Sequence, residues 1–68
     1  MAGTVFKKIE LVGTSPNSLS EAIANAVAKA SESVRGMSWF DVVQQSGSIV
    51  DGKVHEYQVT IKVGFRVE

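Results

Sequence analysis

The chain has 68 residues, with seven basic and seven acidic side chains and no cysteine. A chain of this length forms one domain, 1–68, which buries only about 60% of the surface that it exposes when unfolded. The absence of cysteine excludes disulfides and thiolate metal sites, and the balanced charge argues against nucleic-acid binding through phosphate neutralisation. We therefore expect the domain to gain stability by association with other copies.

No apolar run reaches the roughly 20 residues that span a bilayer. The start of the chain also lacks the apolar segment of a signal peptide. These features favour a soluble cytoplasmic protein.

The first predicted element is a strand over 5–12. Its alternation is imperfect, since Lys7 falls on the same face as Ile9. Glycine, serine, proline and asparagine then give residues 13–17 the composition of a loop. We interpret this loop as a turn and helix cap rather than an anion site, because it lacks a phosphate-binding glycine fingerprint.

A helix is predicted over 19–35, where the chain is rich in alanine and free of proline and glycine. Ser18 and Glu21 have the spacing of a capping box, and Gly36 suits the C′ position after the helix. Apolar side chains recur at helical spacing along one stripe. The stripe consists of Leu19, Ile23, Ala26, Val27, Ala30 and Val34.

Two long strands follow, over 37–49 and 53–67, and Asp51-Gly52 between them is typical of a type I′ hairpin turn. The order strand, helix, strand, strand predicts an α+β subunit of β-α-β-β type. In this subunit a three-stranded antiparallel sheet wraps on one helix.

The hairpin turn sets the register of the two long strands. Counting from Val50 opposite Lys53 places Gln45 opposite Gln58, Val42 opposite Ile61, Phe40 opposite Val63 and Trp39 opposite Gly64. Phe40 and Val42 then join the apolar face, whereas Trp39, Asp41, Val43 and Gln45 join the face of Gln58 and Thr60.

The single tryptophan, Trp39, therefore stands on an otherwise polar sheet surface, opposite a glycine. Two interpretations of this side chain remain open. It covers a sheet edge, or it offers a stacking platform to a flat ligand or a partner subunit. Because one helix covers only one face of a sheet, we expect the other face to lie against another copy or to line an interior space.

No catalytic constellation emerges from the sequence. His55 is the only histidine, which excludes a histidine metal cluster or a Ser-His-Asp triad within one subunit. Lys8 reads as part of a solvated strand end, and the register does not bring Asp41 and Glu56 together as a carboxylate pair. We therefore expect a binding protein rather than an enzyme.

Several segments together resemble one family, the dodecins, along nearly the whole chain. They are Val12-Gly13-Thr14-Ser15-Pro16, the alanine-rich helix, Trp39-Phe40, the Asp51-Gly52 turn, Tyr57-Gln58-Val59 and Lys62-Val63-Gly64-Phe65-Arg66. Each motif is weak alone, and their order and spacing make the likeness specific. The resemblance implies a hollow homo-dodecamer that binds flavins in pairs.

The resemblance also implies roles for particular residues. Trp39 would stack on the flavin ring, and Gln58 would hydrogen-bond its polar edge. Arg66 matches an arginine near the ligand tail, where a flavin phosphate or coenzyme A is held. Ser46 stands where bacterial relatives usually carry arginine, and a hydroxyl cannot bind phosphate in bidentate fashion as a guanidinium does.

The implied function is flavin storage and buffering, with quenching of flavin photochemistry by electron transfer from Trp39. The ligand can be riboflavin, flavin mononucleotide (FMN) or flavin adenine dinucleotide (FAD). Two alternatives are a structural shell that binds coenzyme A or no ligand, and a flavin-dependent enzyme, which would need room for a second substrate.

Overall fold

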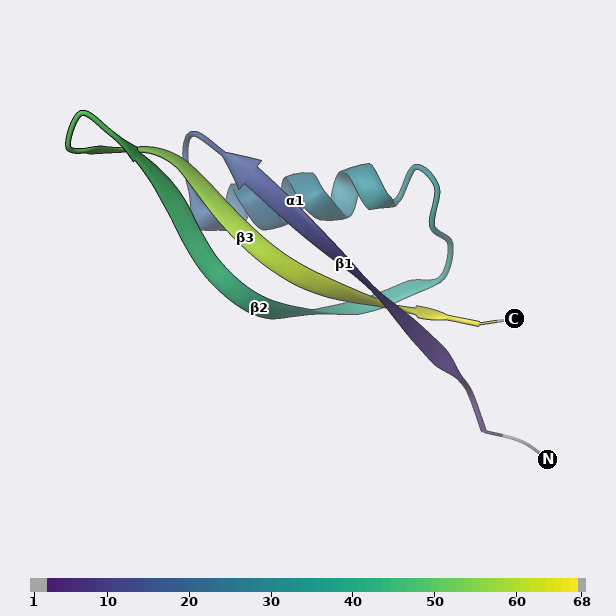
Figure 1. Cartoon of the computed structure of the whole chain (residues 1–68). Helices are drawn as coiled ribbons and strands as arrows, with labels where there is room; N and C mark the ends of the chain where they lie inside the picture. The colour runs from purple at the N-terminus through teal and green to yellow at the C-terminus, as the bar shows by residue number, and fades with distance from the viewer. Residues whose placement is uncertain (1–2, 68) are drawn as a thin grey trace.

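The computed structural model describes residues 3–67 of the chain. Its elements are β1 (Phe6–Ser15), α1 (Leu19–Ala30), β2 (Met37–Val50) and β3 (Lys53–Arg66). The three strands form one antiparallel sheet in the order β1-β3-β2, and α1 lies along one face of it (Figure 1). The predicted β-α-β-β subunit is therefore confirmed.

β1 runs to Ser15, so the prediction of a loop at 13–17 was wrong for its first three residues. Gly13 allows this extension. A Cβ atom at this position would overlap the backbone carbonyl of Ala22 and lie 2.8 Å from the Cβ of Ala26. The missing side chain thus lets the end of β1 pack directly against α1.

The start of α1 is held by Ser18, whose Oγ accepts a hydrogen bond from the backbone N–H of Glu21 at 3.0 Å. Only this half of the predicted capping box forms. The carboxylate of Glu21 instead accepts hydrogen bonds from Ser15 Oγ at 2.6 Å and Asn17 Nδ2 at 2.8 Å. These bonds, that from Ser15 above all, hold the pKa of Glu21 below its usual 4.5.

α1 ends at Ala30 rather than at residue 35. The hydroxyl of Ser31 donates to the carbonyl of Ala28 at 2.7 Å, and short polar side chains of this kind compete with the helical pattern. Gly36 does have a positive φ of 74°, but it turns the connection into β2 and is not the C′ residue of α1.

The core lies between α1 and the strands β1 and β3. Its buried apolar residues are Ala22, Ala26, Ala30, Val59, Ile61 and Val63. α1 packs mainly on β1 and β3, and β2 contributes Met37 at the margin of the core. Phe40 and Val42 are on the helix side of the sheet, as predicted, yet remain 44% and 43% exposed.

The hairpin forms as predicted, because Asp51 and Gly52 both have positive φ, at 53° and 75°, and Val50 pairs with Lys53. The register then shifts, since His55 is an extra residue on β3 and Ser48 faces Glu56.

As a result, Ser46 faces Gln58, and the predicted pairing of Gln45 with Gln58 was wrong. Gln45 faces Val59 on the helix side instead. A second irregularity at Val43 on β2 cancels the first. Trp39 therefore faces Gly64, as predicted.

We predict that the Glu21→Gln variant is less stable than the parent protein at neutral pH, and that this difference in stability becomes smaller as the pH falls. A carboxyl whose folded pKa is lowered stabilises the fold above its unfolded pKa, near 4.5, and this contribution is lost as the pH falls through the folded value. Thermal unfolding followed by circular dichroism at neutral pH and well below pH 4.5 measures this. Glu10→Gln, which removes an exposed carboxylate of β1, is the control. A difference independent of pH would contradict the prediction.

Candidate functional site

The candidate site is centred on Trp39, on the sheet face opposite to α1. Its indole lies across β3 at Gly64, and it is 38% exposed. A Cβ atom at residue 64 would overlap the six-membered ring of the indole, with Cε2 only 2.6 Å away. The absence of a side chain at Gly64 is therefore what allows the indole to lie against the strand, and the predicted face of Trp39 is confirmed.

Phe6 of β1 packs against the same indole. The two ring centroids are 5.1 Å apart and the rings are inclined at 72°, an edge-to-face contact. The sequence interpretation missed this contact, because it did not establish that β1 pairs with β3. The observed pairing of Lys8 with Gly64 places Phe6 within reach of Trp39.

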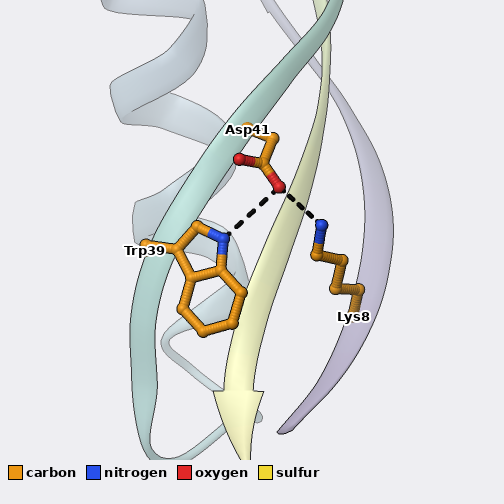
Figure 2. A network of polar contacts seen from close by, with 3 residues as sticks. All are labelled: Lys8, Trp39 and Asp41. Atoms are coloured by element: carbon orange, nitrogen blue, oxygen red, sulfur yellow. Dashed lines mark hydrogen bonds and ion pairs between the residues drawn. The ribbon is translucent and has the colours of Figure 1, made fainter.

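An ion pair lies beside the indole. The Nε1–H of Trp39 donates to Asp41 Oδ2 at 3.3 Å, and the same oxygen accepts from Lys8 Nζ at 2.7 Å (Figure 2). Lys8 Nζ also lies 5.9 Å from the centroid of the indole. Lys8 is thus part of this site, contrary to its interpretation as a solvated strand end.

The electrostatics of the ion pair centre on Asp41. The hydrogen bond from Lys8, followed by that from Trp39, holds the pKa of Asp41 below its usual 3.8. Lys62, which faces Asp41 in the ladder, acts in the same direction. Asp41 therefore stays ionised at neutral pH and remains an acceptor for the indole N–H.

Gln58 shares the sheet face of Trp39, but the two residues are not close together within one chain. Gln58 precedes Gly64 by six positions on β3, which corresponds to about 20 Å along a strand. Its Nε2 donates to Glu56 Oε1 at 3.3 Å.

The two remaining candidate residues lie at opposite ends of this face. Ser46 is beside Gln58, and its Oγ donates to the backbone carbonyl of Gln58 at 3.5 Å. Arg66 lies two positions beyond Gly64 on β3, facing Phe6 in the ladder. One chain therefore carries a Trp39–Arg66 end and a Gln58–Ser46 end.

The arrangement is suited to a flat ligand. The outer side of a supported indole offers a π-surface for stacking, and the neighbouring Lys8 and Asp41 supply charges at its edge. Within residues 3–67, no group of three or more histidine, cysteine, aspartate or glutamate side chains is placed to hold a metal ion. In the same range, α1 is too short to cross a membrane.

Comparison with known proteins identifies the family. The family model for dodecin matches residues 5–68. The chain belongs to the dodecin family. It is 48% identical to the dodecin of Thermus thermophilus over 66 aligned residues, which are 97% of this chain and 96% of that protein. The resemblance inferred from the sequence is therefore confirmed.

Solved dodecin structures share the fold. A Thermus thermophilus structure superposes with a TM-score of 0.93, at 48% identity and with 97% of each chain covered. The dodecin of Streptomyces coelicolor gives a TM-score of 0.94 at 44% identity, covering 100% of this chain and 97% of that one. A Mycobacterium tuberculosis relative named calcium dodecin is 31% identical over 64 residues, which are 94% of this chain and 90% of that protein.

We predict that Gly64→Ala displaces the indole of Trp39 from the sheet. The added methyl group cannot coexist with the six-membered ring in its present place. The fluorescence of Trp39, the only tryptophan in the chain, should shift to longer wavelength as the ring becomes more hydrated. Gly3→Ala is the matched control, because nothing lies within 4 Å of a Cβ atom there. An emission spectrum equal to that of the control would show that the indole does not need the glycine.

Proposed function

We propose that this dodecin binds flavins and stores them in stacked pairs between Trp39 side chains of two subunits, within a hollow shell of twelve copies. The observation that carries the proposal is the indole itself. It is held against Gly64 with 38% of its surface exposed, on a sheet face that α1 does not cover. A large aromatic side chain in such a place is suited to stacking on a flat ring.

The shape of the chain supports assembly. A compact chain of this length has a radius of gyration of about 11 Å. The observed value is 14.3 Å, and the longest dimension is 58 Å. The long β2–β3 hairpin extends past α1 at its tip, so much of it has no cover within the subunit (Figure 1). Contacts between copies would cover this surface.

A second copy also accounts for Gln58. A ring stacked on Trp39 lies about 20 Å along β3 from the Gln58 of the same chain. We therefore assign the contact with the flavin edge to Gln58 of another subunit. Because its Nε2 already donates one hydrogen bond to Glu56, its Oε1 is the natural acceptor for the flavin ring N–H.

The ends of the face would bind the ligand tail. Arg66 would supply a guanidinium to a phosphate of FMN, FAD or coenzyme A. Ser46 is uncharged and weakens this interaction relative to an arginine. The proposal therefore covers flavins as a class, riboflavin included.

Storage with quenching accounts for the surroundings of Trp39. Asp41 Oδ2 accepts hydrogen bonds from both Lys8 and the indole N–H, which supports a structural rather than a catalytic role for this ion pair. Direct contact between an indole and an excited flavin permits electron transfer from Trp39, which would quench the flavin before it reacts with oxygen. Chromatography of the ligand released from purified protein would test the proposal directly. A colourless protein that leaves added riboflavin fluorescent would favour a structural shell.

We predict that Trp39→Ala weakens riboflavin binding at least about tenfold. Stacking of a nucleic-acid base on an aromatic side chain contributes roughly 1–3 kcal/mol, and we apply this range to the flavin ring. Each 1.4 kcal/mol changes affinity about tenfold. Flavin that still binds should regain fluorescence, because the electron donor is gone. Light scattering should give the mass of twelve subunits for both proteins, since Trp39 lies outside the core beneath α1. Unchanged affinity and quenching in an intact assembly would refute the stacking role.

We predict that Ser46→Arg strengthens binding of FMN more than binding of riboflavin, because only FMN offers a phosphate to the new guanidinium. Titration of both ligands at low and high salt measures the difference, which should shrink at high salt. Ser46→Gln is the matched control, with a long side chain and no charge. Equal effects on the two ligands would show that residue 46 is remote from the ligand tail.

A further inference from the structure

We propose that Asp41, anchored by Lys8, is a positioning residue that fixes the orientation of the Trp39 indole before any ligand binds. The consequence for flavin affinity rests on the function proposed above. The positioning itself is a property of the unliganded protein and can be measured without flavin.

The contact with Gly64 does not determine the orientation of the ring by itself. A glycine offers only backbone against which an indole can lie, and a ring turned over about its χ2 bond would cover the same area. The Nε1–H is the one polar group of the indole. Its hydrogen bond to Asp41 Oδ2 distinguishes the two orientations, because turning the ring over moves the N–H away from the carboxylate.

Asp41 needs an anchor of its own. It lies on an open sheet face, with 49% of its side chain exposed, and a free carboxylate there could rotate toward water. Lys8 prevents this by binding the same oxygen at 2.7 Å (Figure 2). Lys8 and Trp39 both face Gly64 in the ladder, one from each side, and residue 64 has no side chain to separate them.

Three strands therefore fix one ring. β3 supplies the backbone at Gly64, β2 supplies Trp39 with its acceptor Asp41, and β1 supplies Lys8 and the ring of Phe6. A ring ordered in advance does not lose rotamer freedom when a ligand stacks on it. Without the tether, riboflavin binding should weaken by about threefold to tenfold.

The test compares Asp41→Ala, Asp41→Asn and Lys8→Met with the parent protein. In the absence of ligand, circular dichroism and time-resolved fluorescence anisotropy at the long-wavelength edge of indole absorption, where Tyr57 and the phenylalanines do not absorb, report on Trp39, the single tryptophan of the chain. Asp41→Ala should lose the indole dichroism and show faster local motion of the ring. Asp41→Asn keeps an acceptor oxygen but loses the ion pair, and Lys8→Met keeps the acceptor but loses its anchor. The dichroism and ring motion of both variants should therefore lie between those of the parent protein and those of Asp41→Ala.

Glu10→Gln is the matched control. Glu10 flanks Lys62 on the side opposite to Asp41, on the same sheet face, so its change removes a nearby negative charge without removing the acceptor of the indole. It should leave the tryptophan signals as they are. Light scattering and far-ultraviolet circular dichroism verify folding and assembly. Should Asp41→Ala fail to assemble, Asp41→Asn and Lys8→Met decide the question.

Riboflavin titrations then complete the comparison. Unchanged dichroism and anisotropy in the Asp41 variants would overturn the positioning role. A mobile indole that binds riboflavin as tightly as the parent protein would overturn its consequence for affinity. If the parent protein itself does not bind riboflavin, the flavin proposal fails, while the ligand-free measurements still decide whether Asp41 orients the ring.

Discussion

The close contact between an indole and bare backbone at Gly64 is the constraint on which the candidate site depends. It requires a glycine at the centre of the three-stranded sheet, where a side chain would ordinarily stand. The same gap lets Lys8 reach Asp41 across β3. A glycine inside a strand weakens the strand, so its place here is best explained by what lies over it.

The packing of α1 leaves the other sheet face free for this site. Small residues along the helix and Gly13 on β1 bring α1 close to β1 and β3, and much of β2 stays uncovered. One subunit thus has a core on one side of the sheet and an aromatic site on the other. The half-exposed Phe40 at the uncovered part of β2 makes association of subunits the natural completion of this fold.

Much of the fold could be predicted because strong local signals fix it. Asp51-Gly52 determines the hairpin, and the alternation of β3 determines which face is buried. The ends of α1 and β1 were less predictable, because Ser31 and Gly13 act through contacts that composition does not show. The strand order β1-β3-β2 brings Phe6 and Lys8 to the indole, and no periodicity in one strand reveals which other strand lies beside it.

Two of the three register shifts between β2 and β3, those at His55 and Val43, explain why the site was predicted better than the stretch between them. The extra residue on β3 at His55 shifts the pairing, and the extra residue on β2 at Val43 shifts it back. Counting from the turn is therefore correct at Trp39 and wrong at Gln45. The shifted stretch has a consequence for the ligand. It places Ser46 directly beside Gln58, on the face of Trp39, so residue 46 lies at the Gln58 end of this face and away from the indole of the same chain.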